Sequence, residues 1–413
     1  MLHRYQIRQI KFKSGERHAV LIHPNGSVPF YPSYYAMSVS RIGKSVNTVV
    51  SELTAIKHLY TWADTTGVDL HESIVSGKML SLSQIDSLVH ACQLSYKNLV
   101  ADIESSSTSA NKVLELRAKF GDFVSSGTQS IRLNYIIKYL DWLIFELFKK
   151  SDAKNFSEVT EKKKDFLQCI KARIPNMRPD SYSAISTPKG YDLTVHRRIL
   201  DVIEPTHPDN PWRGDFVRHR NCLYVNMCLA LGLRLGDTES LEVTHIVRTA
   251  NPPYLQIHRK PDNPEDPRIR EPNIKTLPRT LVIERAWFHL LCDYIDIHRR
   301  KLPATKRHPF LFVSRSGQPI SRDSARRIVT GLRQVDGIPD DITQHTLRHA
   351  WNERFSEICD ERGVSPEQEA FARREYMGWS PSSGMPARYN RRRLKRKADE
   401  YSLEMQSKII RKK

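Results

Sequence analysis

The stretch QHTLRHAWNERFSEI, residues 344–358, has the spacing of an amphipathic helix. Its apolar side chains recur every three or four positions, at Leu347, Ala350, Trp351, Phe355 and Ile358. His345 and Arg348 are three residues apart, so they share a different face of the predicted helix. An imidazole therefore stands beside a planar guanidinium, although a solvated helix face without any site would carry the same pair.

A second polar motif, GLRLGDTESL at residues 232–241, predicts a corner between two helices. Gly232 and Gly236 bracket Arg234, and Asp237 is well placed to cap the helix that follows. Such a corner holds the arginine where its forked donors can point outward. An ordinary surface arginine beside a turn is the alternative interpretation.

The third motif is SPEQEAFARREYMGW, residues 365–379, which predicts a helix that ends at Gly378. Trp379 follows directly, and it either fills the core or presents its indole N–H at the edge of a polar site. Ten residues later, Tyr389 stands among arginines. A phenol there is either a surface group or a nucleophile that attacks a phosphate, and the loop SPSSGMP between the two aromatic residues could bring it back toward a pocket.

The composition favours a polyanionic partner. The 413 residues include 65 Lys and Arg against 46 Asp and Glu, a formal net charge of +19. The basic run RRRLKRK at residues 391–397 accounts for only part of that excess. A balance this basic is typical of proteins that bind nucleic acid.

The sequence gives no reason to expect a metal or another cofactor. None of the six cysteines forms a CxxC pair, which argues against a zinc ribbon. His345 and His349 have the spacing of a zinc helix, but Thr346 stands where HExxH chemistry requires glutamate. No apolar run approaches the roughly 18–20 residues of a membrane span, and no signal peptide is evident, so we expect a soluble, cytoplasmic protein.

Changes of pattern along the chain predict two domains. Residues 1–40 are rich in valine, isoleucine and aromatic residues, and we expect them to form an extended N-terminal arm. Helical periodicity predicts a helical domain over residues 41–175, and a segment with three prolines that begins at Pro175 marks residues 176–195 as a linker. Residues 196–395 form the second domain, which a basic tail at 396–413 follows.

Two strands are expected inside the second domain, in YLQIHRK (254–260) and in IKTLPRTLVI (274–283). The segment between them, PDNPEDPRIREPN, is too rich in proline and aspartate to be a strand interior. Helical patterns precede and follow this pair, so the second domain is expected to combine helices with a small sheet.

Each motif is weak alone, but their order along the chain is specific. An arginine in a GLRxGD corner, a two-stranded segment with a lysine, HxLRH, MGW and a tyrosine near the C-terminus together closely resemble the tyrosine recombinase, or phage integrase, family. The resemblance covers residues of about 190–395, and the helical N-terminal domain resembles that family's core-binding domain less specifically. It implies a mainly α fold with a small antiparallel β-sheet. The implied architecture is a two-domain DNA clamp, in which a helical, SAM-like core-binding domain is joined to an α+β catalytic domain.

The resemblance also implies roles for individual residues. Arg234 and Arg348 match the two arginines that grip the scissile phosphate. His345 matches the histidine of the HxxR motif. Tyr389 matches the nucleophile of the family.

Three further positions correspond to the family pattern with differences. Trp379 falls where most members have histidine and a few have tryptophan, so an imidazole is lost but an N–H donor remains. Asp237 matches an acidic residue that supports the first arginine. The lysine of the family's β-hairpin matches Lys275 better than Lys260, because the KT of IKTLPRTLVI resembles the family strand, but the insertion between the two lysines obscures the hairpin tip.

Function follows from the same resemblance. It implies a site-specific recombinase or integrase that cleaves and rejoins DNA strands through a 3′-phosphotyrosine intermediate, without metal or ATP, to integrate or excise a mobile element. The implied partner is double-stranded DNA, which a homotetramer binds at two sites. The protein is expected in the nucleoid, with no membrane partner. Arg391, Arg392 and Arg393 are expected to contact backbone phosphates, unless their run is only a solvated face. Two other functions stay open, a catalytically inactive DNA-binding accessory factor and a relaxing enzyme like the type IB topoisomerases.

Overall fold

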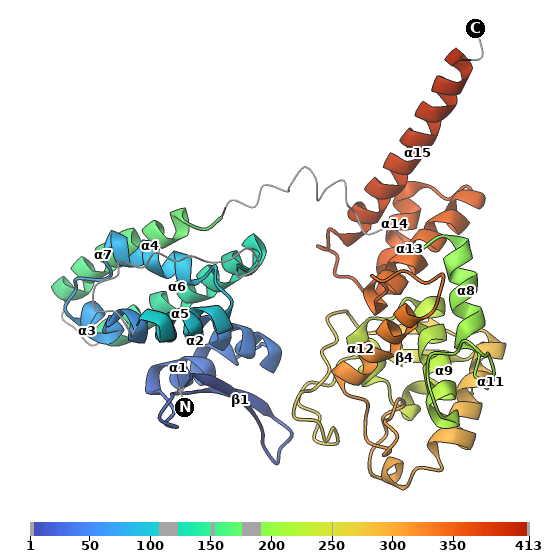
Figure 1. Ribbon diagram of the computed structural model, residues 1–413, viewed down its shortest axis with the longest axis horizontal. Coiled ribbons are helices and arrows are strands. Elements are labelled where there is room, and N and C mark those ends of the chain that lie inside the picture. Colours follow the sequence, from blue (N-terminus) through green and yellow to red (C-terminus); the bar gives the residue numbers. More distant parts are fainter. Residues whose placement is uncertain (1–3, 107–122, 150–152, 176–190, 250, 411–413) are drawn as a thin grey trace. The chain divides into compact units, whose positions relative to one another are not determined.

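Helices make up most of both units into which the chain divides, Met1–Ser181 and Tyr182–Lys413. Each unit also contains a small antiparallel sheet, with two strands in the first and three in the second. The computed structural model, drawn in Figure 1, describes residues 4–106, 123–149, 153–175, 191–249 and 251–410. The mainly α fold with a small antiparallel sheet is therefore confirmed, and a second sheet is added. Within these ranges, no helix has both the length and the apolar character needed to cross a membrane.

The first unit consists of a β-hairpin followed by helices. Its elements are β1 (Gln6–Lys11), β2 (Arg17–Ile22), α1 (Phe30–Tyr35), the π-helical turn η1 (Ala36–Ser40), α2 (Val46–Thr66), α3 (Leu70–Val75), α4 (Leu82–Ala91), α5 (Tyr96–Ser106), α6 (Ser126–Phe148) and α7 (Ala153–Ala172). One face of α2 forms the centre of the core, where Val49, Leu53, Ile56 and Leu59 are fully buried. These residues recur at the 3.6-residue period from which the helix was predicted.

The N-terminal residues do not form the separate arm expected for positions 1–40. β1 pairs with β2 in antiparallel register, from Gln6 opposite Ile22 to Lys11 opposite Arg17. Ala19 on β2 is fully buried in the same core as α2, and the residues after the hairpin form α1 and η1 instead of extended chain. Because an isolated two-stranded hairpin is marginally stable in water, its burial against the helices is what holds it.

The second unit alternates helices with one three-stranded sheet in the order β3-β4-β5. Its elements are α8 (Leu193–Ile203), α9 (Asp215–Leu231), α10 (Leu235–Ser240), the 3₁₀ turn η2 (Val243–His245), β3 (Ile246–Val247), β4 (Tyr254–Ile257), β5 (Arg279–Val282), α11 (Arg285–Asp293), the π-helical η3 (Tyr294–Arg299), the 3₁₀ turn η4 (Pro303–Arg307), α12 (Arg322–Thr330), the 3₁₀ turn η5 (Gly331–Gln334), α13 (Gln344–Glu361), α14 (Pro366–Met377) and α15 (Met385–Ile410). Every residue of α9 from Asn221 to Leu229 is buried, so this helix is the centre of the unit.

Helix α13, predicted from its apolar stripe, packs against α9. Leu347 and Ala350 are buried as expected, whereas Ile358 at the far end of the stripe is 49 % exposed. Helix α14 begins with a capping box at Ser365 and ends, as predicted, at Gly378, which has a left-handed conformation, φ 63°. The helical predictions in this unit are therefore confirmed, except at the end of the α13 stripe.

Two predicted boundaries differ from the structure. The linker expected at residues 176–195 lies mostly outside the described residues, and its last part already belongs to α8, which begins at Leu193. The catalytic domain was expected to end at residue 395, but α15 continues without a break from Met385 to Ile410. Tyr389 consequently lies in a long helix and not in a loop before a tail.

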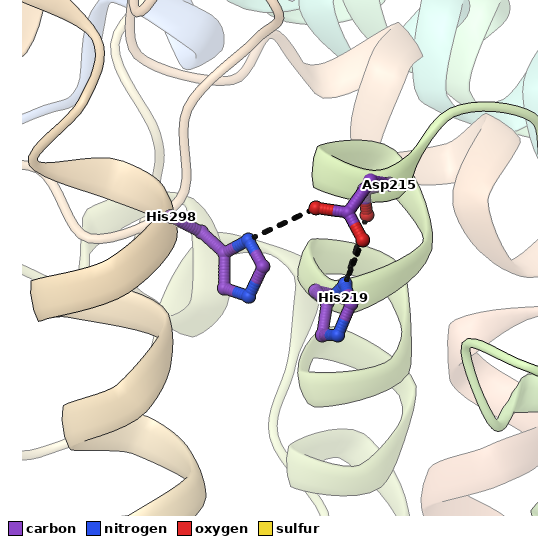
Figure 2. A group of neighbouring side chains, drawn as sticks. All are labelled: Asp215, His219 and His298. Atoms are coloured by element: carbon purple, nitrogen blue, oxygen red, sulfur yellow. Dashed lines mark hydrogen bonds and ion pairs between the residues drawn. The ribbon is translucent and has the colours of Figure 1, made fainter.

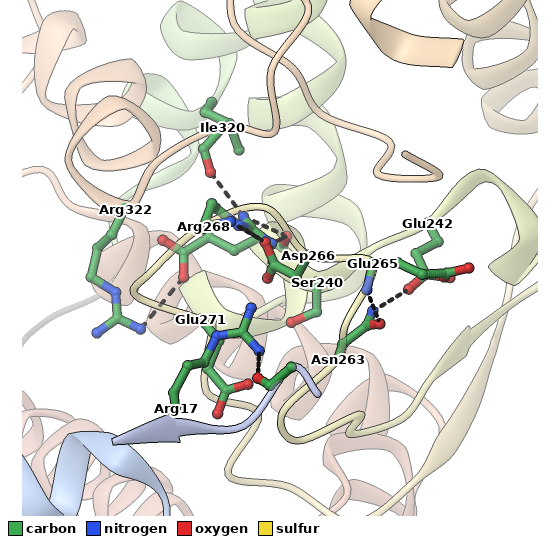
Figure 3. A network of polar contacts seen from close by, with 12 residues as sticks. Arg17, Ser240, Glu242, Asn263, Glu265, Asp266, Arg268, Glu271, Ile320 and Arg322 are labelled. Carbon is green, nitrogen blue, oxygen red and sulfur yellow. Dashed lines mark hydrogen bonds and ion pairs between the residues drawn. The ribbon is translucent and has the colours of Figure 1, made fainter. Parts of the chain in front are cut away.

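The two predicted strands of the second unit are shorter than expected, because the segment between β4 and β5 folds onto the unit (Figure 3). Arg268 anchors this segment with donors to both carboxylate oxygens of Asp266, at 2.8 and 2.9 Å, and to the backbone oxygens of Glu239 and Ile320. The backbone of Asn273 passes so close to α10 that a Cβ atom at Gly236 would lie 2.2 Å from its carbonyl oxygen. The segment is thus a fixed cover over α10 and not a free hairpin tip.

We predict that Gly236→Ala destabilises the second unit by about 1–3 kcal/mol, because the added methyl group overlaps backbone that cannot move without displacing the whole segment. Urea unfolding followed by circular dichroism measures this change. Gly384→Ala is the control, since a Cβ there meets no atom within 4 Å. Equal stability of the two variants would contradict the close approach.

Candidate active site

The corner that carries Arg234 depends on the end of α9. Gly232 terminates α9 in a left-handed conformation, φ 59°, and a Cβ atom there would lie 3.0 Å from the side chains of Trp351 and Met377. The chain then extends through Arg234, whose backbone N–H donates to the Asp237 carboxylate at 3.0 Å. The GLRxGD motif therefore forms the predicted corner, and Asp237 caps α10 as expected.

Asp237 is fully buried and is shared between two strong donors. Besides the N–H of Arg234, its Oδ2 accepts from Nη2 of Arg279, the first residue of β5, at 2.8 Å. Arg279 also donates through Nη1 to the Thr276 hydroxyl at 2.7 Å. The sequence analysis did not include Arg279 in the site, although its position in the strand after the KT pair was visible. It ties the sheet to the corner through one buried carboxylate.

Arg348 joins α13 to the same corner. Its side chain is 3 % exposed, and its Nη1 donates to the backbone oxygen of Gly232. Its guanidinium carbon lies 5.8 Å from the ring centre of Trp379. Arg348 thus touches both the residue that ends α9 and the residue that follows α14.

The site has an excess of buried positive charge. Burial, and next the charge of Arg234, lowers the pKa of Arg348 to about 9, which still leaves it protonated at neutral pH. Burial also lowers the pKa of Arg234. Among the described residues, Arg279 has a direct ion pair with Asp237, but Arg234 and Arg348 have none with any carboxylate. An arrangement of this kind favours the binding of an anion.

Three buried donors point to the same conclusion. In the described part of the chain, no acceptor lies within hydrogen-bond distance of Nη1 of Arg234, Nη2 of Arg348 or Nε1 of Trp379. A buried donor without an acceptor costs about 1–3 kcal/mol, and more when it is charged. The oxygens of a phosphate would satisfy all three.

Tyr389 lies against this group from the second turn of α15. It is 4 % exposed, and its ring is nearly parallel to that of Trp379, with ring centres 5.8 Å apart. Burial is the largest effect on the pKa of Arg234 and of Arg348, and it lowers both. The phenol of Tyr389 is close enough to act in the opposite direction on both pKa values. The structure therefore gathers the predicted arginines, the tryptophan and the tyrosine around one place.

A histidine that the sequence analysis did not assign contacts the phenol. A hydrogen bond of 2.9 Å joins the Tyr389 hydroxyl to Nδ1 of His349, which is buried on α13. The predicted histidine, His345, is exposed one turn earlier, and its ring meets His349 edge-on with centres 4.3 Å apart. The HxLRH spacing contained this information, because residues four apart share a helix face, but the pair was considered only as zinc ligands.

A second buried arginine in this unit has its charge paired with a carboxylate, although its Nε and Nη1 have no acceptor among the described residues. Arg373 on α14 lies 5.3 Å from the Tyr389 ring centre and is fully buried, as is the Glu369 carboxylate with which it forms an ion pair. Ser356 donates to the same carboxylate at 2.7 Å. Arg373 therefore supports the tyrosine ring as part of a neutralised pair, in contrast to Arg348.

The two candidate lysines differ in their surroundings. Nζ of Lys260 lies 2.9 Å from the buried carboxylate of Glu242. Lys275 is exposed, and two residues later the backbone N–H of Leu277 donates to the oxygen of Gly378 at 2.8 Å. Lys275 is thus close in the chain to the turn that positions Trp379. The side chains of the predicted DNA contacts Arg391, Arg392 and Arg393 lie outside the described residues, although their backbone belongs to α15.

Comparison with known proteins gives a family match for the second unit. The model of the phage integrase family matches residues 215–391. No curated protein matches this chain.

Solved structures similar to the chain include three recombinases. XerA recombinase is 14 % identical over 87 % of this chain and 92 % of its own, with a TM-score of 0.35. XerH site-specific recombinase, in a post-cleavage complex with palindromic difH substrate, is 13 % identical over 84 % and 97 %, with a TM-score of 0.42. The integrase of transposon Tn1549, in complex with transposon right end DNA, is 12 % identical over 75 % and 94 %, with a TM-score of 0.37.

We predict that Arg279→Met destabilises the second unit by about 3–5 kcal/mol, because it leaves the buried Asp237 carboxylate without its ion-pair partner. Thermal and urea unfolding measure the loss. Arg326→Met is the control, since Arg326 and Asp323 form an exposed pair whose removal should change stability by less than about 1 kcal/mol. A loss no larger than the control's would show that Arg279 does not support the corner.

Proposed function

We propose that this chain, which belongs to the phage integrase family of tyrosine recombinases through residues 215–391, cleaves and rejoins DNA strands through a covalent bond between Tyr389 and a 3′ phosphate. Site-specific recombination is the activity of that family. The observation that carries the proposal for this chain is the convergence of the three buried donors, Nη1 of Arg234, Nη2 of Arg348 and Nε1 of Trp379, beside the phenol of Tyr389. Guanidinium and indole N–H groups are donors of the kind that the nonbridging oxygens of a phosphodiester accept from.

The first step is nucleophilic attack by the phenol. A free tyrosine has a pKa near 10, so only about one phenol in a thousand is ionised at pH 7, and a base is needed. In the proposed step, the Tyr389 hydroxyl gives its proton to Nδ1 of His349 while its oxygen attacks phosphorus. The bond between phosphorus and the 5′ oxygen breaks, and Lys275 gives a proton to that oxygen. The products are a 3′-phosphotyrosine bond and a free 5′ hydroxyl.

The arginines act on the transition state. Negative charge grows on the phosphoryl oxygens as the phenol attacks, and preorganised guanidiniums stabilise that charge without further reorganisation. Loss of one such donor typically lowers the rate about 100–1,000-fold. Exposed His345 adds a further donor to the phosphate in this proposal, and the N–H of Trp379 takes the place of an imidazole N–H.

The second step is the reverse reaction with a different strand. A 5′ hydroxyl attacks the phosphotyrosine, and the phenol leaves as the new phosphodiester forms. Because the number of phosphoester bonds stays constant, the exchange needs no ATP. We extend the proposal to duplex DNA as partner, a homotetramer on two DNA sites, and the integration or excision of a mobile element, with the basic residues at 391–393 contacting backbone phosphates.

We predict that Tyr389→Phe abolishes the covalent attachment of the chain to DNA but leaves DNA binding within about threefold. A nicked suicide substrate made from the DNA that flanks the gene traps the adduct, and denaturing gels detect it. Tyr401→Phe is the matched control, since Tyr401 lies on the same helix and is 66 % exposed. An adduct formed by Tyr389→Phe would refute the assignment, and no adduct with the unmodified chain would favour an inactive DNA-binding factor.

We also predict that Lys275→Ala slows cleavage by about 100-fold or more, because the departing 5′ oxygen loses its acid. A substrate with sulfur in place of that oxygen should restore the rate, since a thiolate leaves without a proton. His349→Gln should remain slow on the sulfur substrate because the nucleophile still needs a base. Lys260→Ala, in which the Glu242 pair is lost, is the control, and a sulfur-rescued defect in that variant would reassign the acid to Lys260.

A further inference from the structure

We propose that Asp215, His219 and His298 form a binding site for a divalent metal ion of the zinc type. This site lies outside the DNA-joining machinery and does not depend on the proposed function. Asp215 and His219 project from the first turns of α9, while His298 projects toward them from η3 (Figure 2). The three ligand atoms lie within 4.8 Å of one another.

The distances fit a single ion. Nδ1 of His219 lies 3.3 Å from one carboxylate oxygen of Asp215, and Nδ1 of His298 lies 3.6 Å from the other. Zinc ligands at about 2.0–2.2 Å in a tetrahedral arrangement are separated by roughly 3.3–3.6 Å. To bind a common ion, both rings must turn, and Nδ1 of His219 must give up its hydrogen bond of 3.0 Å with the backbone oxygen of Asp215.

The fold holds the two histidines together without a metal. Their rings stack with centres 4.0 Å apart and planes 24° from parallel. His298 is placed by a π-helical segment, whose wider turn is often found at functional sites, and its neighbours Tyr294 and Ile295 are buried in the core. Because both helices are anchored by the core, the ligands are brought together before an ion binds.

The exposure of the ligands leaves room for a further ligand. The side chain of His298 is 12 % exposed, that of His219 37 % and that of Asp215 78 %. The site is therefore covered by protein at His298 and open to solvent at Asp215. Three protein ligands with an open position filled by water are a common zinc arrangement. The positive end of the α9 dipole opposes a cation, but that effect is weaker than three direct ligands.

The donor set identifies the class of ion. Two imidazoles and one carboxylate suit Zn²⁺, Co²⁺ and Ni²⁺, whereas Ca²⁺ and Mg²⁺ prefer oxygen ligands alone. Helix α9 has 17 residues, so the site at its first turn is about 25 Å from Gly232 at its other end. A metal there connects α9 to η3 and takes no part in chemistry at Tyr389. We expect it to stabilise the second unit.

Cobalt titration of the full, tag-free chain tests the site. Tetrahedral Co²⁺ bound by nitrogen and oxygen gives visible d–d bands, and the absence of a thiolate charge-transfer band distinguishes it from Co²⁺ bound by cysteine. We expect one equivalent of Co²⁺, displaced by Zn²⁺. His219→Gln and His298→Gln should each weaken binding by more than about 100-fold, because the loss of a direct ligand exceeds the 10–100-fold effect of an outer partner.

His289→Gln is the matched control, since His289 is an exposed histidine on α11 next to η3. This variant should bind Co²⁺ as the unmodified chain does. Zn²⁺ should raise the Tm of the second unit in the unmodified chain and in the control, but not in His298→Gln, whose circular dichroism spectrum without metal should be unchanged. The proposal is overturned if no ion binds, if a thiolate band appears for the bound equivalent, or if the two ligand variants bind as tightly as the control.

Discussion

The site depends on one hydrogen bond, from the guanidinium of Arg348 to the backbone oxygen of Gly232. It joins α13, which carries the histidines, to the corner at the end of α9, which carries Arg234. Both partners are constrained: Gly232 is in a left-handed conformation, where a Cβ would lie only 3.0 Å from neighbouring side chains, and Arg348 is almost completely buried. If this bond were lost, the two guanidiniums would no longer be held next to each other.

Holding two arginines together without a carboxylate for each works against stability. Arg373 and Glu369, a few residues away on α14, show that the fold can neutralise a buried arginine where none of its charge is needed. At Arg348 and Arg234 the excess charge remains, because neither guanidinium has an ion pair with a carboxylate among the described residues. We interpret this as preorganisation for an anion. Burying the unpaired guanidiniums lowers the stability of the fold, and binding of a phosphate would offset that loss.

Helix α9 links the features of the second unit. Its buried middle forms the core, its C-terminal end sets the corner of Arg234, and its first turns carry Asp215 and His219. The segment between β4 and β5 then covers α10 and leads through Thr276 to Arg279, which holds Asp237. The polar site is thus built where the end of α9, β5, α13 and α15 meet. The cluster of Asp215, His219 and His298 lies at the opposite end of α9.

The sequence by itself determined the helices and the order of the polar motifs, because the 3.6-residue period, the capping box at Ser365 and the stop at Gly378 are local properties of the chain. It also singled out Arg234, Arg348, Trp379 and Tyr389, which the structure brings together. It could not determine whether an extended segment packs against the helices of its unit, so the hairpin at residues 6–22 was predicted to be an arm. Only the tertiary structure decided that His349 contacts the phenol, that Arg279 holds Asp237, and that His298 stacks on His219, because each depends on how helices and strands distant in sequence pack against one another.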